Sequence, residues 1–150
     1  MPCIEVKTEI DADIEKCFDL ARDVTFYQST LKNPTEMAIG GKVSGLVQKG
    51  DFTLWETRHL YIHQHLTLKV TEFESPVLFV DEMIEGSFKS YKHQHIFKEL
   101  QNKTLMIDRF YFESPYGVIG KLYDTFILKK HIKNLLVFRN AALKEKAEAL

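Results

Sequence analysis

Residues 114–150 read SPYGVIGKLYDTFILKKHIKNLLVFRNAALKEKAEAL, and this stretch decides the fold. It opens with the turn signal Ser-Pro-Tyr-Gly and then contains one further glycine, Gly120, and no proline. Its second part predicts an amphipathic helix, because apolar residues recur at steps of three and four at Leu128, Ile132, Leu135, Leu136, Leu143, Ala147 and Leu150. Residues 118–128 are apolar on most sides, so we expect the rest of the chain to cover them.

The residues before this helix predict one strand, two short helices and then six more strands. The first strand covers 3–10, Asp11 or Asp13 caps the first helix, and Asp23 caps a shorter one that ends at Asn33-Pro34. A period of two then predicts further strands at 35–43, 52–62, 66–73, 77–84, 88–100 and 104–112. We expect a bend at Gly40-Gly41 in the first of these strands. The connections are short, so we expect an α+β fold in which a seven-stranded antiparallel sheet packs on the long helix. We expect residues 1–150 to form a single domain.

The charge, apolar runs and cysteines of the sequence limit which kinds of partner and compartment we expect. The 20 basic and 21 acidic residues give a net charge of −1, so bulk charge favours neither nucleic acid nor an anionic membrane. We interpret Lys129, Lys130 and Lys133 as a solvated helix face. No apolar run reaches the roughly 18 residues of a membrane span. Cys3 and Cys17 lack the spacing of metal ligands, and we expect both to be reduced and buried in a cytoplasmic protein.

The order of elements and several local motifs resemble a known group of proteins. The motifs are GDFTLW at 50–55, SPVLFVDEM at 75–83, GSF at 86–88, HQHIF at 93–97, TLMID at 104–108 and SPYGVIG at 114–120. Together they are similar to the START-like (SRPBCC) superfamily with its helix-grip fold, and most to its small single-domain bacterial polyketide cyclase/dehydrase-like branch. The resemblance implies a cavity between a curved sheet and the long helix, suited to an apolar or amphipathic small molecule.

Register arithmetic predicts which side chains face that cavity. A turn at Gln101-Asn102 places each residue of 91–97 opposite a partner in 106–112, with His95 opposite Asp108. The inward face of this hairpin is then Tyr91, His93, His95, Phe97, Met106, Asp108, Phe110 and Phe112. A turn near His63-Gln64 adds Trp55 and His59 to the same face, and Leu135 faces it from the helix. Either Asp81 or Glu82 could point inward.

These residues allow three functions. The first is binding of a lipid-like or polyketide-like molecule by the cavity residues Trp55, His59, Tyr91, His93, His95, Phe97, Met106, Asp108, Phe110 and Leu135. The second is a cofactor-independent cyclase or dehydratase, in which His95 or His93 acts as general base and Asp108 or Glu82 polarises it. The third is a protein-interaction module that uses the distal end of the long helix, Lys144 to Leu150, as a partner surface. An exposed stripe of Leu143, Ala147 and Leu150 that forms a homodimer contact would support it.

Binding is the function that we favour, because the inward face is aromatic and carries the polar residues His59, His93, His95 and Asp108. The simplest interpretation of His95 and Asp108 themselves is a buried hydrogen-bonded pair across two strands. The motif His-Gln-His occurs at 63–65 and 93–95, and His93 and His95 could ligate one metal with Asp108 or Glu82. We nevertheless expect no metal, because the first copy falls on a predicted turn and the resemblance implies a superfamily that is not generally metal-dependent. We expect no other cofactor. Along the long helix, we expect residues 118–128 to pack against protein and residues 132–138 to form the ceiling of the cavity.

Overall fold

The computed structural model describes residues 3–30, 36–59 and 62–149. Its elements are β1 (Cys3–Ile10), α1 (Ile14–Ala21), α2 (Val24–Ser29), β2 (Glu36–Gly41), β3 (Phe52–His59), β4 (Ile62–Glu74), β5 (Leu78–Gly86), β6 (Ser90–Leu100), β7 (Lys103–Glu113), α3 (Gly117–Tyr123), the π-helical segment η1 (Asp124–Leu128) and α4 (Lys129–Glu148). The predicted α+β order is confirmed, including the two short helices after the first strand.

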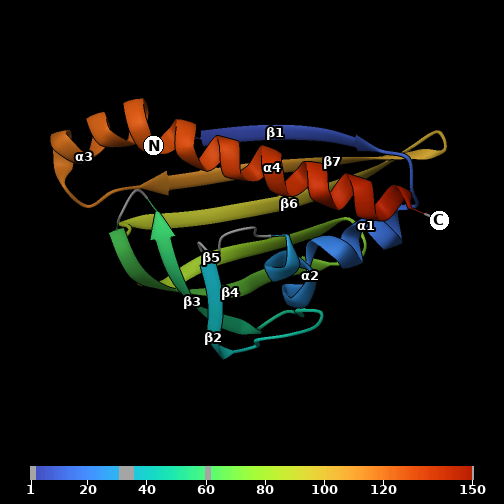
Figure 1. Ribbon diagram of the computed structural model, residues 1–150, viewed down its shortest axis with the longest axis horizontal. Helices are drawn as coiled ribbons and strands as arrows, with labels where there is room; N and C mark the ends of the chain where they lie inside the picture. Colours follow the sequence, from blue (N-terminus) through green and yellow to red (C-terminus); the bar gives the residue numbers. More distant parts are fainter. Residues whose placement is uncertain (1–2, 31–35, 60–61, 150) are drawn as a thin grey trace.

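The strands form one curved antiparallel sheet of seven strands in the order β1-β7-β6-β5-β4-β3-β2. Consecutive strands from β2 to β7 are neighbours, and β1 closes the far edge against β7. Segments α3, η1 and α4 form one continuous helix of 32 residues, and α4 runs lengthwise along the sheet (Figure 1). The sheet and this helix therefore form the two layers of the fold.

The β6–β7 hairpin has the predicted register. Phe97 lies opposite Met106, and His95 lies opposite Asp108. Asn102 in the turn has a φ of 63°, a left-handed conformation that asparagine adopts more readily than most residues. All of the residues of this hairpin that were predicted to face inward are buried or half-buried, so the tight turn set the register correctly.

The other turns and bends agree with the prediction only in part. The register of β2 against β3 shifts between Ala38 and Gly40, which confirms the expected bend. The turn predicted at His63-Gln64 is wrong, because both residues belong to β4 and pair with Arg58 and Thr57. Instead, β3 ends at His59 and β4 begins at Ile62. The predicted end of the second helix at 33–34 lies outside the described residues, and α2 ends at Ser29.

The solid core lies beneath the C-terminal half of α4. Phe18 of α1 contacts Phe73, Phe79 and Phe97 edge to face, with centroids 5.3 to 5.5 Å apart. Leu143 and Ala147 of α4 are buried in the same cluster. The proposed interaction stripe is therefore wrong for these two residues, because α1 and β1 pack against this part of the helix; Leu150 lies outside the described residues.

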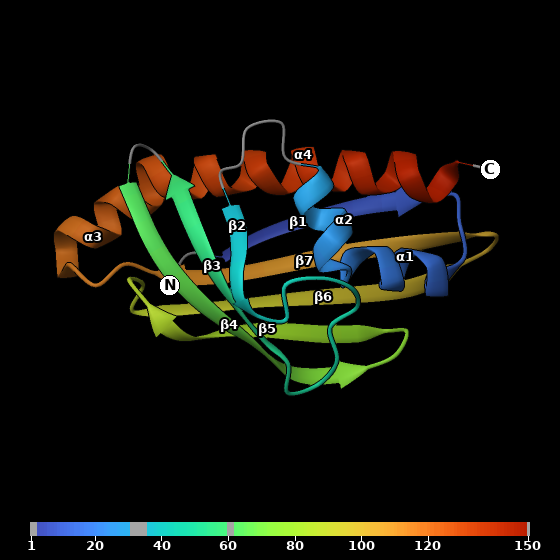
Figure 2. The ribbon, with the colours of Figure 1, turned by 60° about the horizontal axis from the view of Figure 1, so that its bottom comes forward.

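The first part of the helix differs most from expectation. Val118, Ile119 and Phe126 are 74%, 77% and 73% exposed, although they were expected to be covered. In both views α3 lies at one end of the molecule, next to the end of β7 from which it emerges (Figures 1 and 2). Among the described elements, only η1 packs extensively against α3, so no described strand covers the outer side of α3.

The two cysteines also lie in different environments. Cys17 is buried on α1, as expected, and burial raises the pKa of its thiol. Cys3 is exposed, so the prediction that it is buried is wrong. The reason is the alternation of β1, which places Cys3 on the same face as Glu5 and Lys7. Both cysteines are free thiols.

Candidate functional site

A cavity of about 540 Å³ lies between the concave face of the sheet, α2 and the helix. Its walls are mostly apolar, and the sheet contributes Trp55, Leu66, Val70, Phe79 and Phe110. Ile132, Leu135 and Leu136 line it from the part of the helix that was predicted to form its ceiling, and Leu128, which was expected only to pack against protein, lines it as well. Val137 and Phe138 point to the surface instead.

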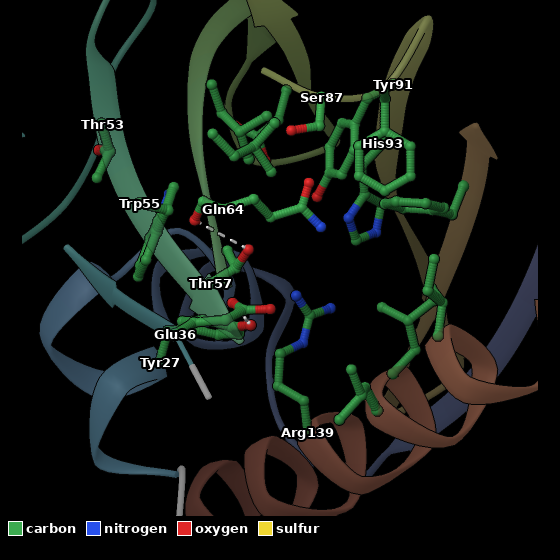
Figure 3. A pocket seen from close by; sticks show the side chains of 18 of the residues that line it. Tyr27, Glu36, Thr53, Trp55, Thr57, Gln64, Ser87, Tyr91, His93 and Arg139 are labelled. Carbon is green, nitrogen blue, oxygen red and sulfur yellow. Dashed lines mark hydrogen bonds between the residues drawn. The ribbon is translucent and has the colours of Figure 1, made fainter. Parts of the chain in front are cut away.

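Polar side chains gather at one part of this wall (Figure 3). Arg139 extends from α4 into the cavity, with His93 on β6 at one side. Tyr27 of α2 and Glu36 of β2 lie at the other side, where the Tyr27 hydroxyl donates a short hydrogen bond to the Glu36 carboxylate. The Arg139 guanidinium carbon lies 5.8 Å from the centre of the Tyr27 ring, within range of a cation–π contact. Arg139 therefore lies between His93 of the interior strand β6 and the Tyr27–Glu36 pair, which comes from α2 and the edge strand β2.

Asp108 holds this arrangement together from behind the cavity wall. Its side chain is completely buried and accepts three hydrogen bonds. One Asp108 oxygen accepts from His93 Nε2 at 2.8 Å and from Arg139 Nη2 at 2.9 Å. The other accepts from Asn140 Nδ2 at 2.7 Å. A carboxylate that accepts from several donors, one of them charged, fixes the orientation of each of them.

The pKa values follow from these contacts. Burial alone would raise the pKa of Asp108, but the charge of Arg139 and the His93 hydrogen bond outweigh it, leaving that pKa well below its usual value. Burial, with a smaller effect from His95, lowers the pKa of His93 to about 4, so His93 is neutral near pH 7. An ionised carboxylate only accepts, so the proton of this neutral ring lies on Nε2.

His95 makes a different pair from the one predicted. Its Nε2 lies 3.0 Å from Asp81 Oδ2, whereas its Nδ1 lies 3.6 Å from Asp108 Oδ1, too far for a hydrogen bond. The predicted His95–Asp108 bond is therefore wrong, because His93, two residues earlier on the same face, takes that oxygen. Asp81 lies opposite His93 on the neighbouring strand and lines the cavity, which settles the choice between Asp81 and Glu82.

The predicted site residues fall into three groups. Those that line the cavity are Trp55, Tyr91, His93, His95, Phe110 and Leu135. Phe97 and Met106 lie in the solid core instead, and Asp108 lies behind the wall. The side chain of His59 is outside the described part of the chain. The role of all of these residues in binding stays a prediction.

The three side chains His93, His95 and Asp108 also have the ligand types of a metal site. Their candidate ligand atoms all lie within 4.8 Å of one another. Arg139, however, donates to the same Asp108 oxygen that would have to face the metal. A cation would meet this guanidinium at close range, and such repulsion between like charges is strong where water is excluded. The arrangement therefore fits a hydrogen-bond network better than it fits a metal site.

Sequence reasoning missed several polar residues of the cavity wall, among them Tyr27, Glu36, Gln64 and Arg139. A signal existed for Arg139, which follows Ile132 and Leu135 at helical spacing and so shares their face. The other three come from α2, β2 and β4. They meet only because the sheet curves, which no local pattern shows.

The cavity opens at one end of the molecule. Of its described lining residues, those exposed to solvent are Ser87, Pro115, Tyr116 and Ile119. They belong to the connection between β5 and β6 and to the beginning of the long helix. Gly120 and Tyr123 line the cavity from the inner side of α3. We call this end the mouth of the cavity.

Comparisons with known proteins identify the fold. The sequence matched no protein-family model and no curated protein. TTHA0849 from Thermus thermophilus is similar in structure over 97% of both chains, with a TM-score of 0.78 and 15% identity. A START superfamily protein from Mycobacterium smegmatis is similar over 97% of both chains, with a TM-score of 0.71 and 14% identity.

The ginseng major latex-like protein 151 from Panax ginseng matches 99% of this chain with 98% of its own, at a TM-score of 0.68 and 11% identity. At such identities the similarity concerns architecture alone. Taken with the seven-stranded curved sheet and the long helix that covers it, these matches show that the chain has the START-like (SRPBCC) helix-grip fold.

Proposed function

We propose that residues 1–150 act as one domain that binds a small hydrophobic or amphipathic molecule in the cavity between the sheet and the long helix. The observation that carries this proposal is the 540 Å³ cavity with apolar walls and one polar group of side chains. Its volume falls within the roughly 300–1,000 Å³ of small-molecule sites, which combine apolar walls with a few placed polar groups in the same way. Apolar ligand surface would supply the affinity, and the polar group would set the orientation. We also propose a cytoplasmic location, in line with the two free thiols.

The charges around the polar group favour a neutral polar end on the ligand. Burial raises the pKa of Tyr91 well above its usual value, and the nearby carboxylates of Glu36 and Asp81 raise it further. The charge of Arg139 is already matched by Asp108 behind it. A ligand carboxylate would therefore approach two carboxylates and gain little from the guanidinium. A hydroxyl or carbonyl group can hydrogen-bond to Arg139 or Tyr91 without this repulsion.

Native mass spectrometry and thermal-shift measurements with a long-chain alcohol and the matching fatty acid test both parts of the proposal. We expect binding of the alcohol and weaker binding of the acid. If neither the alcohol nor the acid binds, and sterols and aromatic polyketides do not bind either, the cavity proposal is contradicted. Tighter binding of the acid would refute only the reasoning on charge.

A pair of variants shows whether binding occurs in the cavity. Leu135 lines the cavity, whereas its neighbour Asn134 is exposed. Leu135→Trp should weaken ligand binding about tenfold or more, because overfilling a packed site costs roughly 1–3 kcal/mol. Asn134→Trp should bind as the wild type does. Equal affinity of the two variants would place the ligand elsewhere.

The acid–base alternative is less well supported. His93 lines the cavity and is oriented by Asp108, which is the geometry of a general base. Its pKa of about 4 nevertheless makes it a weak proton acceptor at neutral pH. Asp108 is sealed from the cavity, so it cannot act on a ligand directly. Unchanged ligand after long incubation with the protein supports binding; a transformed product would revive the enzyme hypothesis.

A further inference from the structure

The beginning of the long helix exposes a continuous apolar surface, which we call the α3 patch. It consists of Tyr116, Val118, Ile119, Leu122, Phe126 and Ile127, each at least half exposed. Val118, Leu122 and Phe126 follow one another at steps of four, so they lie along one side of the helix. Single exposed apolar residues are ordinary, but a contiguous group of this kind marks an interaction surface.

The α3 patch adjoins the mouth of the cavity. Tyr116 and Ile119 belong to both, since they line the cavity and yet are 75% and 77% exposed. The inner side of α3 thus lines the cavity beside its mouth, while its outer side forms the patch. Whatever covers the patch also faces the entrance.

The charges within this segment have one sign. Exposed lysines lie at 121, 129, 130 and 133, and none of them forms an ion pair with a described residue. The only acidic residue between 116 and 133 is Asp124. It is buried, and its carboxylate accepts hydrogen bonds from the backbone and hydroxyl of Ser114. The apolar patch is therefore accompanied by unneutralised positive charge, although the whole chain has a net charge of −1.

We infer that the α3 patch docks on the surface of an anionic lipid bilayer, with the mouth of the cavity facing the membrane. An interfacial helix inserts its apolar side among the acyl chains and places lysines near the headgroups, as this segment could do. Each lysine near an anionic surface contributes on the order of 1 kcal/mol of attraction. Among residues 3–30, 36–59 and 62–149, no helix is long and apolar enough to cross a bilayer, so the contact is peripheral.

A second copy of the chain fits the patch less well. A symmetric dimer presents the same surface from both sides. Two α3 patches in contact would bring the lysines of both copies together without an exposed acid of the same segment to offset them. Anionic headgroups supply the missing charge.

Vesicle co-sedimentation of the full chain tests the inference, with no cavity ligand added. We expect binding to vesicles made of an equal mixture of phosphatidylcholine and phosphatidylglycerol, and weak binding to vesicles of phosphatidylcholine alone. Binding to the mixed vesicles should be lost at high salt. The double variant Ile119→Ser/Phe126→Ser should abolish binding. Ile39→Ser is the matched control, because it changes an exposed residue of β2 that is distant in sequence from the α3 patch. This variant should bind as the wild type does.

A charge variant keeps the test independent of the apolar substitutions. Lys129→Ala/Lys130→Ala should weaken binding to the anionic vesicles about tenfold or more, whereas Lys98→Ala on β6 should not. Failure of wild type to bind anionic vesicles would overturn the inference, as would binding that the α3 variants leave unchanged. A dimer that Ile119→Ser/Phe126→Ser dissociates, with no vesicle binding, would assign the patch to a second copy. Because the assay needs no cavity ligand, its failure would leave the proposed binding function standing.

Discussion

Replacing Asp108 by asparagine tests the network behind the cavity most directly. The amide has nearly the same shape as the carboxylate, so the substitution removes charge and acceptors without opening a cavity. Asp108 accepts hydrogen bonds from His93, Arg139 and Asn140, whereas the amide offers one acceptor oxygen and turns an NH₂ group toward donors. It also leaves Arg139, whose side chain is only 12% exposed, without its counter-ion.

The expected cost follows from burial. Removing one partner of a buried ion pair destabilises a protein by about 3–5 kcal/mol. In a chain of 150 residues, each kcal/mol lowers the melting temperature by about 2–4 °C. Asp108→Asn should therefore melt roughly 6–20 °C below the wild type, measured by circular dichroism or calorimetry at pH 7.

Glu5→Gln is a matched control on the same sheet. Glu5 Oε2 and Arg109 Nε lie 2.8 Å apart, as close as the atoms of the buried network, but both side chains are about 40% exposed. Water screens this pair, so the control should melt close to the wild type. If Asp108→Asn melts no lower than Glu5→Gln, the reasoning that burial makes the network strong is refuted.

Two further predictions concern pH and the two ends of the helix. The folded state holds the pKa of His93 at about 4, below its ordinary value of 6.5, so between these values only the unfolded chain binds the proton. The free energy of unfolding should thus fall by about 3 kcal/mol as the pH drops from 6.5 to 4. Urea denaturation at several pH values should show a shallower fall for His93→Gln than for the wild type. The same pH dependence in both proteins would contradict the assignment of this effect to His93. On the helix, Leu143→Ala should cost about 2–5 kcal/mol because its side chain is 1% exposed, whereas Leu122→Ala, at 55% exposure, should cost little. Similar costs at the two positions in urea denaturation would show that the helix packs differently along its length.

Much of the architecture could be predicted because its causes are local. The turn at Gln101-Asn102 fixes the pairing of β6 with β7, and that pairing places Tyr91, His93 and Asp108 on one face. The caps Asp13 and Asp23 accept hydrogen bonds from the helices that they open. Such features depend on neighbours a few residues away, so the sequence states them directly.

Predictions failed where distant segments or element ends decide the outcome. The bulges between β4 and β5 shift the register there, so counting from the flanking turns could not choose between Asp81 and Glu82. Likewise, the prediction that His93 and His95 share one face of the strand was correct. Which of the two side chains hydrogen-bonds to Asp108 depends on side-chain angles and on Arg139 from the other layer.

The sequence by itself determined the order of elements, the antiparallel pairing and the apolar character of the long helix, since period and turn chemistry are properties of short segments. Only the tertiary structure decided what that apolar character is used for. Leu143 is buried because α1 and β1 pack beneath it, whereas Val118 is exposed because no described strand packs against the outer side of α3. Burial depends on which distant surfaces meet, and that is fixed by the curvature and extent of the whole sheet.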